Sequence, residues 1–185
     1  MSTDLAGALT KLQPSFTRLQ RRADTSLQFC DAALLPEPIL YDTTVYIDVL
    51  HGKLSDHLKR EIARLDPWHS AVAESEMTYL CGRLDPAHSG TSYVVRQIAS
   101  IVDRWPKNRV LNPDRDIWRE AAILTGILAR LQHARDEDRG RTMNDALIFL
   151  SALRHGCTVL SRNVRDFDLL MQLVPAGKAI FYHIQ

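Results

Sequence analysis

The sequence has few cysteines and no long apolar run, and both absences narrow the class of protein. Cys30, Cys81 and Cys157 are odd in number and far apart in a chain of 185 residues. Because disulfide frameworks and zinc sites need paired or closely spaced cysteines, we expect neither, and free thiols in a reducing compartment are the simpler interpretation. No stretch is apolar over the length of a membrane span or of a signal peptide. We therefore expect a cytoplasmic protein that does not enter a membrane.

An excess of either charge is also absent. The chain has 23 Lys and Arg residues against 22 Asp and Glu residues, which gives a net charge of +1. No strong overall field therefore draws it to nucleic acid or to an acidic membrane, so any such binding would need local patches, metal ions or the groove of a dimer. The length fits one compact domain with a core large enough to fold without cross-links.

The first 38 residues differ in pattern from the rest. Pro36 and Pro38 close this segment and favour an extended backbone there. Apolar residues recur at helical spacing on both sides of Pro14, namely Leu5, Leu9 and Leu12 before it and Phe16, Leu19 and Ala23 after it. The pattern predicts a helical N-terminal extension over residues 1–38, followed by a second unit over residues 39–185.

Beyond the extension, strand patterns alternate with helical ones. Strands are expected at 39–41, 69–73, 110–111, 157–161 and 179–184. Helices are expected from Asp42-Thr43 to about residue 65, from Glu74–Met77 onward, and over 94–102. Two more helices are expected, one after a cap at Asp116 and one from Asn144-Asp145 to a C-cap at Gly156. Residues 135–141 are expected to form a solvated loop between them. This alternation predicts an α/β fold with a mostly parallel sheet covered by helices on both faces.

Carboxylates recur where these strands end. In an open parallel sheet, ligands bind at the carboxyl ends of the strands, and a helix can begin at the same edge. Several acids meeting there would repel one another unless a divalent cation neutralised them, and oxygen-only ligands select Mg²⁺ or Mn²⁺ over zinc. The acids at these positions are Asp42, Glu74 or Glu76, Asp145, and the pair Asp166 and Asp168.

Each of these acids also has a purely structural explanation. Asp42 and Asp145 could cap helices, because an Asp side chain accepts hydrogen bonds from free backbone N–H groups. Glu74 and Glu76 could be first-turn acids that interact with the helix dipole. Asp166 and Asp168 could be charges of a surface loop. The repeated placement at strand ends is what favours a metal site.

Four segments resemble the motifs of PIN-domain ribonucleases, most closely the VapC-type toxins of type II toxin–antitoxin pairs. Residues 41–48 resemble the opening strand that ends in Asp-Thr or Asp-Ser, and residues 70–77 resemble the second motif. Residues 144–148 and 156–167 resemble the third and fourth motifs, and the fourth is the most specific match. The resemblance implies a three-layer α/β/α PIN-like fold, an Mg²⁺ or Mn²⁺ cofactor, endoribonuclease activity on RNA, a homodimer and a cognate antitoxin.

The resemblance also implies residue roles. A Ser precedes the ligand Glu by six positions in the second motif, which selects Glu76 over Glu74, although Gly82 follows later than usual and leaves Glu74 open. The implied metal-binding and catalytic set is Asp42, Glu76, Asp145 and Asp166. The implied substrate-binding set is Thr43, Arg162, Asn163 and Arg165, of which the two arginines could instead belong to a solvated basic loop.

Two other functions compete with this one. A PIN-like module could bind RNA or a protein without cutting, although acids at all four positions weigh against it. A phosphatase of the haloacid dehalogenase type also places Asp at the end of its first strand, but that chemistry needs Asp-x-Asp, and Thr44 stands at the second position. The sequence does not encode which RNA would be cut.

Overall fold

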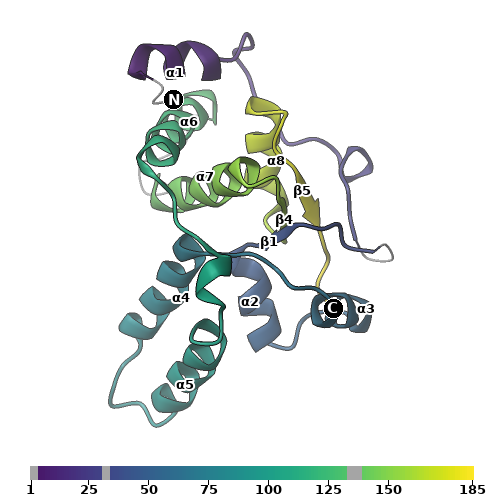
Figure 1. Ribbon diagram of the computed structural model, residues 1–185, viewed down its shortest axis with the longest axis vertical. Coiled ribbons are helices and arrows are strands. Elements are labelled where there is room, and N and C mark those ends of the chain that lie inside the picture. The colour runs from purple at the N-terminus through teal and green to yellow at the C-terminus, as the bar shows by residue number, and fades with distance from the viewer. Residues whose placement is uncertain (1–3, 31–33, 133–138) are drawn as a thin grey trace.

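A parallel sheet forms the centre of the protein. The computed structural model describes residues 4–30, 34–132 and 139–185 (Figure 1). The strands are β1 (Ile39–Tyr41), β2 (His69–Ser70), β3 (Val110–Leu111), β4 (Thr158–Ser161) and β5 (Ala179–Phe181). Strands β1, β4 and β5 pair in that order, and β2 pairs with β3. A bridge between Leu40 and Trp68 joins the two groups, and all of these pairings are parallel. The spatial order is therefore β3-β2-β1-β4-β5.

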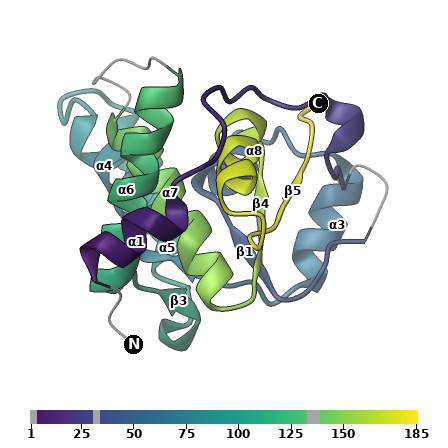
Figure 2. The same ribbon diagram turned by 90° about the horizontal axis from the view of Figure 1, so that it is seen from above.

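Helices cover both faces of the sheet, as expected. Figure 1 shows α2, α3, α4 and α5 below the strands and α6, α7 and α8 above them. Figure 1 and Figure 2 both show α1 against α6. The bounds are α1 (Leu5–Leu12), α2 (Thr43–Leu50), α3 (Asp56–Arg64), α4 (Ala71–Arg83), α5 (Thr91–Val102), α6 (Arg115–Gln132), α7 (Arg139–Arg154) and α8 (Val164–Leu173). This arrangement confirms the three-layer α/β/α prediction. None of the helices in the described parts of the chain is both long enough and apolar enough to cross a membrane.

The core lies where α7 and α8 pack on β4 and β5. Phe149, Phe167 and Phe181 are fully buried there, and the rings of Phe149 and Phe167 lie 6.4 Å apart between centroids. Gly177 precedes β5 at a point where any Cβ atom would collide with the ring of Phe149. This packing fixes the strand ends from which the candidate site residues project.

The second strand is shorter than the sequence pattern suggested. Strand β2 ends at Ser70 and helix α4 begins at Ala71, so residues 71–73 are helical rather than extended. The Ser70 hydroxyl accepts a hydrogen bond from the Val72 amide at 3.2 Å, which caps the helix. A short apolar run such as 71–73 fits a buried strand and a buried helix equally well by periodicity, and the cap decides between them.

Other predicted boundaries are also wrong. Helix α7 begins at Arg139 rather than at Asn144-Asp145, so Asp145 lies inside the helix and not at its start. Within the predicted loop 135–141, residues 139–141 are helical, whereas 135–138 lie outside the described residues. Helix α6 begins at Arg115, and Asp114, not Asp116, accepts the bond from the Ile117 amide. The strand predicted at 179–184 ends at Phe181.

The N-terminal segment is only partly helical, but it is attached to the domain. Helix α1 is confirmed, whereas the helix predicted around Phe16 to Ala23 does not form. Arg22 donates from its backbone N and its Nε to the buried Asp168 carboxylate, at 2.7 and 2.6 Å. Phe29 pairs in parallel with Phe181 of β5, so the segment covers the outer edge of that strand. Covering an edge strand protects it from pairing with other chains. The domain boundary at residue 38 stays a prediction.

A buried histidine in β2 predicts a pH dependence of stability. The Tyr46 hydroxyl lies 2.7 Å from His69 Nδ1, and the Trp105 ring stacks on the imidazole at 4.5 Å. Burial lowers the pKa of His69 from 6.5 to about 4, with Asp66 opposing this shift and Arg109 adding to it. Because the folded pKa is below the unfolded one, the unfolded chain binds the proton more tightly. Stability is therefore complete above pH 6.5 and falls by about 3 kcal/mol as the pH drops to 4.

The measurement is urea unfolding of the wild type and of His69→Gln between pH 4 and 7. The glutamine keeps a polar partner for Tyr46 but does not titrate, so its free energy of unfolding should depend less steeply on pH in this window. Equal slopes for the two proteins would show that His69 does not carry the effect.

Candidate active site

Asp42 lies at the junction of β1 and α2 with its carboxylate buried. Its side chain is 2% exposed and accepts hydrogen bonds from the hydroxyls of Thr44 and Ser161, each at 2.7 Å. It also caps α2 through the Thr44 amide, at 3.4 Å. Ser161 is the last residue of β4, the strand that pairs directly with β1. The two strand ends therefore hold this carboxylate in one orientation.

Glu76 reaches the same place from the second turn of α4. Its carboxylate accepts hydrogen bonds from the Thr43 hydroxyl and, at 2.9 Å, from the Asn144 amide group of α7. Glu76 lines the cleft beside Asp42, whereas Glu74 is not among the residues that line it. The geometry favours Glu76 over Glu74 for a role at this site. The hydroxyl of Thr43, a residue of the implied substrate-binding set, bonds to Glu76.

Asp145 and Asp166 are joined by a shared amide. Asn163, the N-cap of α8, donates through Nδ2 to Asp145 at 3.0 Å and to Asp166 at 2.9 Å. The backbone N–H of Asp166 donates back to Asn163 Oδ1 at 3.3 Å. Asn163 therefore links the acid of α7 to the acid in the first turn of α8.

The electrostatics confirm that the four acids are neighbours. Burial raises the pKa of Asp145 well above its usual value, and the charges of Asp42, Asp166 and Glu76 raise it further. Burial also raises the pKa of Asp42, although the hydrogen bonds from Ser161 and Thr44 oppose that shift. Raised pKa values at clustered carboxylates are a frequent property of functional sites.

The cluster opens into a cleft of about 780 Å³. Asp42, Glu76 and Asp145 lie along this cleft together with the apolar side chains of Ile47 and Leu80. Within the described ranges, no three Asp, Glu, His or Cys side chains are already arranged around one point as a metal shell. The donors are all oxygens, the type that Mg²⁺ and Mn²⁺ prefer, and Mg²⁺ usually keeps several waters between itself and a protein. The residues therefore fit a hard divalent ion bound partly through water.

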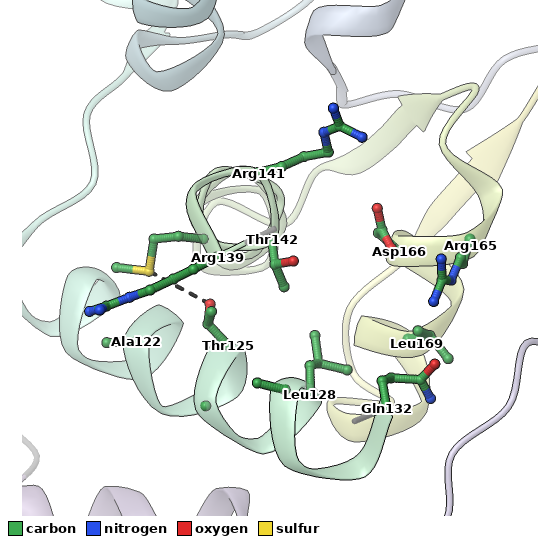
Figure 3. A pocket seen from close by; sticks show the side chains of 13 residues that line it. Ala122, Thr125, Leu128, Gln132, Arg139, Arg141, Thr142, Arg165, Asp166 and Leu169 are labelled. Carbon is green, nitrogen blue, oxygen red and sulfur yellow. Dashed lines mark hydrogen bonds between the residues drawn. The ribbon is translucent and has the colours of Figure 1, made fainter. Parts of the chain in front are cut away.

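Asp166 lines a neighbouring, smaller cavity of about 360 Å³ between α6, α7 and α8. Figure 3 shows Thr142 of α7 and Arg165 and Asp166 of α8 around this cavity, above Leu128 and Gln132 of α6. Arg141 extends from α7 away from α6, and it lines both the cavity and the main cleft. The two spaces are therefore adjacent along α7.

The two arginines predicted to bind substrate differ in their surroundings. Arg162 donates through Nε to the buried Asp48 carboxylate at 2.7 Å, and its backbone N–H donates to Thr44 at 3.1 Å. Its guanidinium is thus held by α2 rather than extended into the cleft. Arg165 is exposed at the smaller cavity and forms no ion pair with another described residue.

Sequence reasoning assigned no role to four residues that hold the predicted site side chains in place. Thr44 and Ser161 bind Asp42, Asn144 binds Glu76, and Asp48 binds Arg162. Each of the first three stands near a predicted site acid in the chain or at the end of a predicted strand. A polar side chain at such a position was the available signal, but its bonding partner depends on tertiary structure.

Comparisons with known proteins agree with the fold. The family model described as "PIN domain" matches residues 39–170. A structure of FitAcB from Neisseria gonorrhoeae superposes with a TM-score of 0.55 at 18% identity, over 77% of this chain and 96% of that one. A structure of DNA-bound VapBC from Salmonella typhimurium superposes with a TM-score of 0.56 at 16% identity, over 78% of this chain and 97% of that one. A structure of VapBC2 from Rickettsia felis, bound to a promoter DNA fragment, superposes with a TM-score of 0.55 at 11% identity, over 78% of this chain and 98% of that one. No curated protein matches the chain.

Proposed function

Because the chain belongs to the PIN-domain family, we propose that it is a metal-dependent endoribonuclease and the toxin of a toxin–antitoxin pair. The observation that carries the proposal is the convergence of Asp42 and Asp145 at one cleft. They come from distant parts of the chain, and the charge of Asp42 raises the pKa of Asp145. A set of buried, mutually repelling carboxylates costs stability, and that cost is expected where a cation completes the site.

In this proposal Asp42, Glu76 and Asp145 hold Mg²⁺ or Mn²⁺, directly or through water, and Asp166 completes the acidic pocket. When bound, the ion would supply acidity to an attacking water and stabilise negative charge on the phosphate. Attack by a water on phosphorus would break the bond to the 3′ oxygen, leaving a 5′-phosphate on one product and a 3′-hydroxyl on the other. The RNA 2′-hydroxyl takes no part.

The polar neighbours fix the acids for this reaction. Ser161 and Thr44 both donate to the same oxygen of Asp42. Thr43 and Asn144 each bond to a different oxygen of Glu76. Asn163 holds Asp145 and Asp166 together and, by exchanging one of these bonds, can contact a phosphate oxygen or a water. Ligands held in this way need little rearrangement, which is how surrounding hydrogen bonds tune a metal site.

The partners follow from the relatives. The superposing structures are of VapBC and FitAcB, some bound to DNA, and we extend from them a cognate antitoxin for this chain. The homodimer is a proposal that comes from the resemblance to VapC-type toxins alone. An antitoxin segment that lay across the cleft and offered an Arg or Lys to the carboxylates would neutralise the same cluster that the metal would. Inhibition and catalysis would then compete for one site.

The deciding experiment is cleavage of a mixed RNA pool by the purified protein. We expect cleavage in Mg²⁺ or Mn²⁺, none in EDTA, and products with 5′-phosphate ends. Asp42→Asn should lose the activity, because it removes a charge from the buried cluster. Binding of RNA with no metal-dependent product would instead support the alternative of a PIN-like module that binds without cutting.

A further inference from the structure

One face of α4 continues the candidate site beyond the carboxylates. Glu76, Tyr79, Leu80 and Arg83 follow one another at helical spacing, and all four line the main cleft. Residues at i, i+3, i+4 and i+7 lie on the same face of a helix, and seven residues rise about 10 Å. The cleft therefore has an acidic part at Glu76 and an apolar and basic part that extends toward Arg83.

Tyr79 is the most prominent side chain of that second part. It is 65% exposed, although it is a large aromatic residue within an otherwise regular helix. The guanidinium of Arg83 lies over its ring, 5.8 Å from the centroid. Ile47 of α2 and Leu80 line the same cleft. An exposed ring beside apolar side chains gives a surface on which a flat aromatic group can stack.

Positive charge flanks this surface. Arg83 of α4 and Arg141 of α7 both line the cleft, so guanidinium groups are present on the two helices that carry Glu76 and Asp145. Neither forms an ion pair with another residue in the described parts of the chain. Guanidinium groups bind phosphate oxygens well, and phosphate contacts position a nucleic acid without reading its sequence.

We propose that Tyr79 stacks on the nucleobase next to the scissile phosphate, while Arg83 and Arg141 bind the flanking phosphates. This inference rests on the proposed nuclease function and adds to it a base-binding residue, Tyr79, and two phosphate-binding residues. Aromatic side chains within a basic groove are the combination by which proteins hold single strands, because every base has a π-face. A base inside a duplex is stacked on its neighbours and is not available to Tyr79.

The test measures binding apart from cleavage. A short unpaired RNA with one 2-aminopurine is titrated with protein in EDTA, and both anisotropy and fluorescence quenching are recorded. The variants are Tyr79→Ala, Tyr79→Leu and Tyr79→Phe, with Tyr93→Ala as the matched control, because Tyr93 of α5 is 61% exposed and does not line the cleft. A fully paired RNA of the same sequence serves as the second substrate.

We expect Tyr79→Ala to raise the Kd by roughly 5- to 150-fold, the range typical for loss of one stacked base. Tyr79→Leu should also lose the quenching, since it keeps an apolar side chain but no ring, whereas Tyr79→Phe and Tyr93→Ala should resemble the wild type. In Mg²⁺ the value of kcat/KM should fall in the same order. The paired RNA should bind more weakly than the unpaired one.

Several results would overturn the inference, and they differ from a failure of the nuclease proposal. Absence of quenching by the wild type, equal binding by Tyr79→Ala and Tyr93→Ala, or equal affinity for paired RNA would each do so. Loss of antitoxin binding with intact RNA binding in Tyr79→Ala would assign the surface to a protein partner. If RNA binding and quenching depend on Tyr79 but no cleavage occurs, the inference about Tyr79 stands and the proposed nuclease activity is rejected.

Discussion

Replacing Asp145 by Asn is expected to abolish cleavage while making the metal-free protein more stable. Asp145 is only 7% exposed, and the charges of Asp42, Asp166 and Glu76 act on it. Asn has nearly the same shape but no charge, so it removes repulsion from the cluster and one ligand from the proposed metal site. We expect activity to fall by roughly 100-fold or more and the free energy of unfolding in EDTA to rise, because burial and the neighbouring charges both disfavour the ionised Asp145.

The opposite directions of the two effects are what make this variant informative. A mutation that merely disturbs packing lowers activity and stability together. Here the thermal midpoint in EDTA should rise by a few degrees for a chain of this size, roughly 2–4 °C per kcal/mol. Adding Mg²⁺ should stabilise the wild type, because only the folded state binds the ion, and should stabilise the variant less.

The matched control is Asp103→Asn, at the exposed C-terminal end of α5 and outside the cleft. This control should change neither the cleavage rate nor the response to Mg²⁺. Wild-type cleavage by Asp145→Asn would exclude the cluster as the active site, whatever the change in stability.

The fold was predictable because its signals are local. The apolar runs at 39–41 and 158–160 indicate buried parallel strands, and the strand–helix alternation leaves few possible topologies. The position of Asp42 follows from the same logic, since it comes directly after β1 and the carboxyl ends of parallel strands share one edge. Asp145 shows where this logic is incomplete, because it reaches the edge from the second turn of a helix rather than from a strand end.

The features that could not be predicted depend on contacts between distant segments. The start of α7 at Arg139 falls in a run of charge and glycine that is typical of a loop, and the helix forms there while packing against α6. Thr43 bonds to Glu76 rather than to Asp42, a choice that depends on how α4 packs against α2. Arg162 is a similar case, since only the folded structure brings Asp48 to it.

The contact between Arg162 and Asp48 predicts a large effect on stability. Replacing Arg162 by Ala should cost about 3 kcal/mol, the low end of the range for breaking a buried ion pair from one side. Asp48 is fully buried, and its Oδ2 accepts from Arg162 at 2.7 Å and from the Tyr182 hydroxyl at 2.9 Å. Its Oδ1 has no hydrogen-bond partner among the described residues. Without Arg162 the buried carboxylate would keep one neutral donor, the Tyr182 hydroxyl.

Urea unfolding measures this cost, and a double-mutant cycle assigns its origin. Arg165→Ala is the matched control, because Arg165 lies three residues further on, is exposed and forms no ion pair with a described residue; its cost should stay within about 0.5 kcal/mol. In the Asp48→Asn background the same Arg162→Ala change should cost much less, since no buried charge is then left unpaired. A cost below about 1 kcal/mol in the wild-type background, typical of a surface pair, would mean that solvent already screens Asp48. Arg162 would then be free to leave α2 and bind RNA phosphate, the role that the sequence alone suggested for it.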